Sequence, residues 1–204
     1  MDSRSQETSA FNPNANPQQE SPQAATLAPA SSPSPRGTYL LWVRDVAVSA
    51  VVSILFILFL YQPVRVEGTS MMPRLENHDR LFINKFVYHF EAINRGDVVV
   101  FHYPMDPSKS YIKRVIGLPG DRVQIVHGHV WLNGKMLRER YVPIRYRDND
   151  SMAATIVPKD CYFVMGDHRS ISSDSRAFGP VERSLIYGKA EFVYWPAKDM
   201  GVVR

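Results

Sequence analysis

Two residues of this chain, a serine and a lysine, have types and surroundings that point most directly to chemistry. Ser70 lies in the segment GTSMMP (68–73), where glycine and proline indicate a defined loop. Lys113 lies in the segment YIKRVI (111–116), a predicted strand on which apolar residues flank it. A lysine buried there would have its charged form disfavoured by desolvation, which lowers its pKa towards neutrality. A neutral amine can take the proton of a serine hydroxyl, so the pair predicts nucleophilic catalysis by serine with lysine as the general base.

Both residues also have an interpretation without chemistry. A serine near glycine and proline usually belongs to a turn, and Lys113 could simply face outward from an alternating strand. Other catalytic and metal-binding patterns are weaker. The chain has no Gly-x-Ser-x-Gly elbow, so an α/β-hydrolase is not indicated. Its single cysteine, Cys161, excludes an intrachain disulfide and is interpreted as a small buried hydrophobe. His127 and His129 flank a turn glycine without an evident third ligand, so we expect no metal site.

The segment before Ser70 divides into a tail and an apolar run. Residues 1–38 are rich in Pro, Ser, Ala and Gln, a composition that buries too little apolar surface to fold, so we expect a disordered tail. Residues 39–61 are apolar except for Arg44 and Asp45, which can pair or reach the interface. The run is long enough to cross a bilayer, and no small-x-small site follows it, as a cleaved signal peptide would need. We interpret it as one transmembrane helix, whose orientation the flanking arginines leave open.

Residues 62–204 have the texture of an all-β domain with antiparallel sheets. Short β-rich runs alternate with turn residues, and Asn133-Gly134 between two of them is a strong hairpin signal. No helical pattern of useful length competes. The predicted strands cover residues 64–66, 80–84, 97–101, 111–116, 122–126, 129–132, 162–165 and 190–195.

Charge adds little about partners. The formal net charge of the 204 residues is +4, which suits a solvated basic surface and allows attraction to anionic lipid headgroups. No dense Lys/Arg block or helix-turn-helix pattern is present, so nucleic acid is not an expected partner. Met71 and Met72, beside Ser70, are either part of the core or an apolar surface near the bilayer, and of the two we favour contact with the bilayer.

Four ordered segments of the chain resemble bacterial type I signal peptidases, which are membrane-bound Ser-Lys endopeptidases. They are GTSMMP (68–73), RGDVVVF (95–101), YIKRVIGLPGD (111–121) and GDHRSISSDSRAFG (166–179). The resemblance covers nearly all of residues 39–196. It implies the fold of that family, with antiparallel sheets around an extended substrate groove, one N-terminal transmembrane helix and no cofactor.

The resemblance also assigns roles to five residues. Ser70 matches the nucleophile and Lys113 the general base of the family. Ser172 matches a serine whose hydroxyl hydrogen-bonds and orients that lysine. Asp174 and Arg176 match a charged pair that supports the site.

Three positions depart from the pattern of the family. Gly68 stands where some members carry a side-chain hydroxyl that helps to bind the oxyanion, so that donor is absent. The Ser70 N–H is one expected donor, and whether water or another backbone group supplies a second stays open. Arg74 replaces a usual threonine, and His168 replaces a usual asparagine. The catalytic pair is unaffected.

The activity implied is removal of signal peptides from exported preproteins, after a small-x-small (Ala-x-Ala-like) motif. The expected partners are such preproteins, emerging from the export machinery, and membrane lipid. The resemblance implies a bacterial cytoplasmic-membrane protein with its catalytic domain on the extracytoplasmic side. Two alternatives stay open: a LexA-like self-cleaving regulator, which would need a DNA-binding domain that residues 1–38 cannot form, and a membrane-tethered binding module without activity.

Overall fold

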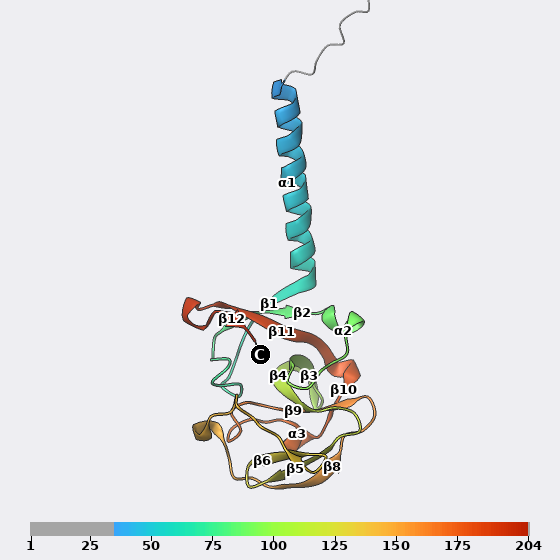
Figure 1. The fold of residues 1–204 in the computed structure, drawn as a ribbon, viewed down its shortest axis with the longest axis vertical. Coiled ribbons are helices and arrows are strands. Elements are labelled where there is room, and N and C mark those ends of the chain that lie inside the picture. The colour runs from blue at the N-terminus through green and yellow to red at the C-terminus, as the bar shows by residue number, and fades with distance from the viewer. Residues whose placement is uncertain (1–34, 204) are drawn as a thin grey trace, which may run out of the picture. The chain divides into compact units, whose positions relative to one another are not determined.

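One long helix and two antiparallel β-sheets account for most of residues 35–203, the part of the chain that this computed structural model describes (Figure 1). The expected disordered tail therefore lies outside the described residues, apart from its last four positions. The helices and strands are α1 (Pro35–Leu60), β1 (Tyr61–Arg65), β2 (Arg80–Asn84), α2 (Val87–Phe90), β3 (Val98–Tyr103), β4 (Asp106–Gly117), β5 (Arg122–Val126), β6 (His129–Leu132), β7 (Lys135–Met136), β8 (Met152–Ile156), β9 (Cys161–Met165), α3 (Ser175–Phe178), β10 (Val181–Glu182), β11 (Ile186–Trp195) and β12 (Gly201–Val202).

Helix α1 contains the apolar run. Tyr39–Leu60 is a 22-residue stretch that is long and apolar enough to cross a membrane, and none of it is buried in the protein. At 1.5 Å per residue it spans about 33 Å, close to the thickness of a bilayer core. Its two charged residues form an ion pair, Arg44 Nη2 to Asp45 Oδ1 at 2.8 Å. The helix differs from the predicted span at both ends: it begins at Pro35, since proline suits the first helical turn, and Tyr61 already belongs to β1.

The larger sheet has the strand order β1-β2-β11-β3-β4-β9-β10, with β12 paired to β11. Every strand pair in it is antiparallel. Strand β4, which carries Lys113, lies inside this sheet. It pairs with β3 from Ser110 to Arg114 and with β9 from Arg114 onward, and its residues from Lys113 to Gly117 are all buried. Since consecutive residues of a strand point to opposite sides, both faces of this half of β4 are covered.

The smaller sheet has the order β7-β6-β5-β8, and Figure 1 labels its strands β6, β5 and β8. Its two hairpins turn at His127-Gly128 and at Asn133-Gly134, where all four residues have positive φ. Two consecutive positive φ values are the signature of a type I′ turn, so the Asn-Gly prediction is confirmed. Strand β8 has the sequence MAATI, in which apolar and polar residues do not alternate, so the sequence did not indicate this strand.

Apolar residues of both sheets form the core in three clusters. One of them packs Met71 and Leu75, from the segment after β1, against Leu81 of β2 and Val98 of β3. Met71 is 1% exposed. The expectation that it contacts a bilayer is therefore wrong, because its side chain anchors the Ser70 loop to the core.

Candidate active site

Ser70 lies in a turn after β1. Packing of a neighbouring side chain in the core and hydrogen bonds of the backbone fix the conformation of this turn. The side chain that follows it, Met71, is buried, while the Met72 N–H donates to the Thr69 carbonyl oxygen at 3.2 Å. Gly68 has φ of 96°, a left-handed conformation that glycine adopts without strain, and its N–H donates to Asn77 Oδ1. The turn therefore presents the Ser70 hydroxyl in a defined direction.

Lys113 reaches this hydroxyl from β4. Its Nζ lies 2.7 Å from Ser70 Oγ and 3.1 Å from the Ile112 carbonyl oxygen. The residue is 4% exposed, so the outward-facing alternative for Lys113 is excluded. The two candidate residues that the sequence separates by 43 positions are thus in direct contact.

Burial decides the protonation of this amine. Desolvation lowers the pKa of Lys113 from 10.5 to about 8, although the carboxylates of Asp174 and Asp167 act in the opposite direction by favouring the charged form. A pKa near 8 leaves an appreciable fraction of neutral amine at physiological pH. That neutral fraction, within hydrogen-bond distance of Ser70, is what a general base requires.

Ser172 lies next to the pair but does not make the expected contact. Its Oγ is buried and has no hydrogen-bond partner within residues 35–203, so the expected bond to Lys113 is not formed. Its neighbour in space is Gly166: a Cβ added there would lie 2.5 Å from the Ser70 carbonyl oxygen and closer still to Ser172 Oγ. The absence of a side chain at Gly166 is therefore what lets the segments of Ser70 and Ser172 approach each other.

Asp174 and Arg176 form the charged pair that the sequence indicated. The Arg176 Nε donates to Asp174 Oδ1 at 2.8 Å, and Asp174 is fully buried. Asp174 Oδ2 also accepts from the Gly166 N–H at 3.0 Å, and Arg176 donates to the Arg169 carbonyl oxygen at 2.8 Å. The pair therefore ties the start of the 166–179 loop to its end.

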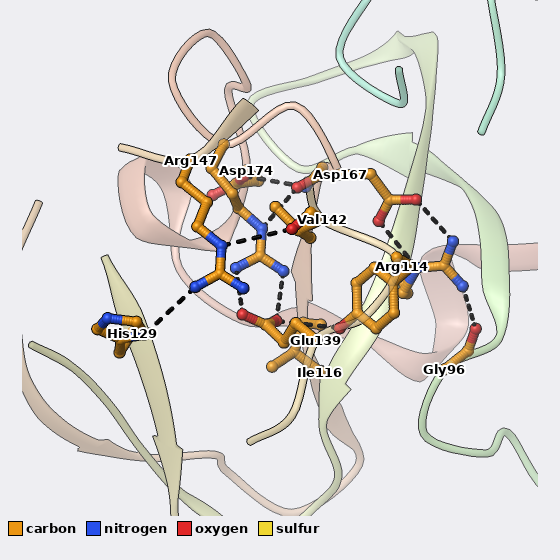
Figure 2. A network of polar contacts seen from close by, with 12 residues as sticks. Gly96, Arg114, Ile116, His129, Glu139, Val142, Arg147, Asp167 and Asp174 are labelled. Atoms are coloured by element: carbon orange, nitrogen blue, oxygen red, sulfur yellow. Dashed lines mark hydrogen bonds and ion pairs between the residues drawn. The ribbon is translucent and has the colours of Figure 1, made fainter. Parts of the chain in front are cut away.

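Two further buried ion pairs at the site were not predicted from the sequence. Figure 2 shows Arg114 between Asp167 and the carbonyl oxygen of Gly96. Its Nε lies 2.8 Å from Asp167 Oδ1, and its Nη1 lies 2.9 Å from the Gly96 carbonyl oxygen. Glu139, from the segment after β7, accepts from both terminal nitrogens of Arg169, one of them at 2.9 Å. No spacing or composition signal marks these partners, because their chain segments meet only in the folded protein.

These contacts attach the loop that carries Ser172 to neighbouring segments. Arg169 Nε donates to the Gly166 carbonyl oxygen at 2.9 Å while its other nitrogens bind Glu139. Arg114 holds Asp167 from β4, one residue after Lys113. Because unpaired buried charges are costly, the loop has little freedom to move without losing several hydrogen bonds.

A groove of about 760 Å³ runs past the serine and lysine. One wall is the segment 64–70 and the other is the stretch of β4 from Lys109 to Lys113. Within the described strands, β9 pairs with β4 only from Arg114 onward, so the β4 edge along Tyr111 and Ile112 has no partner strand on that side. An extended peptide fits such an edge by adding a strand.

The Ser70 backbone N–H is a candidate hydrogen-bond donor to the oxyanion. No backbone group in residues 35–203 accepts a hydrogen bond from it. An oxygen that becomes negatively charged beside Ser70 Oγ could accept that bond, as in an oxyanion hole. Gly68 adds no side-chain donor, as its residue type dictates.

Metal and thiol chemistry have no site of their own in the described residues. No group of three or more His, Cys, Asp or Glu side chains there is arranged to hold a metal ion. Cys161 is partly buried, and burial raises the pKa of its thiol, which disfavours a reactive thiolate.

Comparisons with known proteins point to one family. The model described as "Signal peptidase, peptidase S26" matches residues 39–195. The chain is 35% identical over 174 residues to signal peptidase I P of Bacillus subtilis subsp. natto, a match that covers 81% of this chain and 93% of the relative. It is 34% identical over 176 residues to signal peptidase IB of Staphylococcus aureus, covering 78% and 91%. The crystal structure of a signal peptidase I from Enterococcus faecalis V583 is 32% identical and covers 48% of this chain and 97% of its own, with a TM-score of 0.43.

Proposed function

The chain belongs to the signal peptidase I family, and from that premise we propose that Ser70 and Lys113 cleave the peptide bond at the end of a signal peptide. Membership makes the protein a serine endopeptidase that acts on preproteins carrying signal peptides. The observation that carries the assignment of residues is the 2.7 Å contact between Ser70 Oγ and the buried Lys113 Nζ. Membership in this family argues against the self-cleaving regulator, and the contact between Ser70 and Lys113 is one that an inactive binding module would not need.

Acylation begins with a neutral Lys113. The Ser70 oxygen attacks the scissile carbonyl carbon while its proton moves to Lys113 Nζ. The carbonyl oxygen becomes negatively charged and accepts a hydrogen bond from the Ser70 N–H. When the C–N bond breaks, the lysine ammonium gives its proton to the leaving amine, which is the new N-terminus of the mature protein. The signal peptide is left as an ester on Ser70.

Deacylation uses the same residues with water as the nucleophile. Lys113 is neutral again after acylation, so it can take a proton from a water molecule that attacks the ester carbon. The second tetrahedral intermediate collapses by breaking the bond to Ser70 Oγ, which regains a proton from Lys113. One lysine therefore serves as base and acid in both halves of the reaction.

The substrate is proposed to bind as a β-strand in the groove. The unpaired β4 edge along Tyr111 and Ile112 offers backbone hydrogen bonds, and alternate side chains of the bound strand point to the same side. Side chains one and three positions before the scissile bond would then face the same wall. Small residues at those two positions give the small-x-small (Ala-x-Ala-like) motif.

The membrane arrangement is inferred from helix α1. We assign Tyr39–Leu60 to the bacterial cytoplasmic membrane, with residues 62–204 on the extracytoplasmic side, where preproteins emerge from the export machinery. Protease added outside spheroplasts should digest residues 62–204. If that domain is protected until the cells are lysed, the orientation is the opposite of the one proposed.

A preprotein with a single Ala-x-Ala junction tests the function. The full-length chain in detergent or lipid vesicles should cut it once, and the mature product should begin at the residue after the motif. The matched control is the same preprotein with leucine replacing the alanine just before the bond, which should be cut at least about tenfold more slowly, because a pocket shaped for a methyl group rejects a larger side chain. Equal cleavage of the two, or a cut elsewhere, would contradict the proposed specificity.

A further inference from the structure

His168 contacts the Ser70 turn twice, although it takes no part in the proton transfers described above. Its backbone N–H donates to the Ser70 carbonyl oxygen at 3.0 Å. Its side-chain Nδ1 lies 3.2 Å from the Thr69 carbonyl oxygen. The ring is half-buried and forms a T-shaped contact with the Tyr146 ring, with 4.6 Å between centroids. A single residue of the 166–179 loop therefore holds the carbonyl groups on both sides of the nucleophile.

The proton on the ring can be assigned from chemistry. A carbonyl oxygen only accepts hydrogen bonds, so Nδ1 must carry a hydrogen for the contact with Thr69 to be one. Both the Nδ1-protonated neutral tautomer and the imidazolium ion meet this condition. In either of these forms the contact with the Thr69 oxygen is a hydrogen bond.

The Thr69 carbonyl and the Ser70 N–H belong to the same peptide unit. That unit is planar and trans, so the carbonyl and the N–H point in opposite directions along one plane. Fixing the Thr69 oxygen therefore fixes the direction of the Ser70 N–H. Hydrogen bonds to a carbonyl also polarise its peptide unit, which makes the N–H at the other end a better donor.

We propose that His168 is a positioning residue for the oxyanion hole, acting through the Thr69–Ser70 peptide unit to aim the Ser70 N–H at the developing negative charge. The Met72 N–H, at 3.2 Å, is the other donor to the Thr69 oxygen, but it lies within the same turn and moves with it. His168 is the donor that ties this peptide unit to a different segment of the chain. Because Gly68 provides no side-chain donor, the orientation of one N–H has a large effect on the reaction.

Three substitutions separate the donor from the shape of the side chain. Asparagine in His168→Asn places its amide nitrogen the same number of bonds from the backbone as Nδ1, so it can donate to Thr69. Leucine in His168→Leu has the same branching as asparagine and no donor. Glutamine in His168→Gln keeps a donor but moves it one carbon further out.

The inference rests on the proposed function, and kinetics of the full-length enzyme test it there. Relative to His168→Asn, His168→Leu should lower kcat about tenfold with KM within about twofold, because binding of the peptide does not use the oxyanion donor. His168→Gln should resemble His168→Leu. Equal kcat in the asparagine and leucine variants, a loss confined to KM, or a loss that follows a drop in melting temperature would overturn the proposal. Failure of the unmodified enzyme to cut any preprotein would instead refute the proposed function.

A second measurement needs no activity. In the full-length protein with ¹⁵N-labelled serine, the amide resonance of Ser70, identified by its absence in Ser70→Ala, reports hydrogen bonding at its own peptide unit. It should shift in His168→Leu and return towards the original position in His168→Asn. An amide position that is the same in all three proteins would overturn the proposal even if the variants differ in activity or stability.

Discussion

The pH dependence of cleavage can be worked out from the burial of Lys113. Desolvation lowers the pKa of its amine from 10.5 to about 8. The change corresponds to about 3 kcal/mol against the charged form. At pH 7 about one enzyme molecule in ten then holds the neutral base, compared with fewer than about one in a thousand for an unperturbed lysine. We therefore expect kcat/KM to rise about tenfold per pH unit below about pH 7, about fivefold from pH 7 to pH 8, and to level off above about pH 9.

The assay is initial-rate cleavage of one preprotein well below KM, from pH 6 to pH 10. Ser70→Ala, measured in parallel, gives the background from other hydrolysis. A single ionisation with a midpoint near pH 8 supports the reasoning. A rate that is flat between pH 6 and pH 8 would refute this reasoning, because no group with a pKa near 8 would then control cleavage. A rate that continues to rise through pH 10 would also refute it, because the controlling lysine would then have the pKa of an exposed one.

The same pKa has a consequence for stability. Between about pH 8 and pH 10.5 the unfolded chain binds a proton at Lys113 that the folded chain has released, so this group makes the protein more stable as pH rises through that window. Lys113→Met, which removes the charge and keeps the chain length similar, should raise the free energy of unfolding by about 3 kcal/mol at pH 7, and the gain should disappear by about pH 11. Denaturant unfolding at both pH values measures it; a gain that is the same at both would mean that the burial cost is not one of charge. Two further predictions concern the loop that carries Ser172. Gly166→Ala should lower kcat by at least about tenfold and lower the melting temperature, because the added methyl overlaps Ser172; an active, equally stable variant would show that the close approach is not needed. Glu139→Gln should cost about 3 kcal/mol of unfolding free energy, because it leaves a buried arginine incompletely paired, whereas Glu76→Gln, which breaks a surface pair, should cost less than about 1 kcal/mol. Equal costs for the two would show that the buried pair does not stabilise the loop.

Features of the fold that depend on local sequence could be predicted. The turn at Asn133-Gly134 follows from residues that tolerate positive φ. The antiparallel all-β class follows from short alternating runs, and the apolar helix from composition over Tyr39–Leu60. Each of these is decided by neighbouring residues, which is the information that a sequence pattern carries.

Features that depend on which face of a helix or strand is covered could not be predicted from the sequence. Lys113 and the next residue, Arg114, are both buried because β4 is covered on both faces, whereas alternation alone would expose one of them. Met71 was expected at the surface and lies in the core, since its direction depends on how the turn packs. The pairing of Arg169 with Glu139 joins segments that no sequence signal connects.

Ser172 is a residue for which the family resemblance predicts a contact that the structure does not contain. The resemblance implies that its hydroxyl orients Lys113, yet in the structure that hydroxyl is buried close to the Ser70 backbone with no hydrogen-bond partner in residues 35–203. The orienting bond that the resemblance implies is therefore not present in this structure. A rotation of the hydroxyl group or of the lysine when substrate binds would be needed to form the bond.

The central claim is that Ser70 attacks the peptide bond and that neutral Lys113 takes its proton. The most direct measurement is the rate at which purified full-length wild type, Ser70→Ala and Lys113→Ala cut the same preprotein at pH 9, with circular dichroism to confirm that all three are folded. We predict cleavage at one junction by the wild type and a loss of at least about a thousandfold in each folded variant. Cleavage at the wild-type rate by either variant would contradict the account.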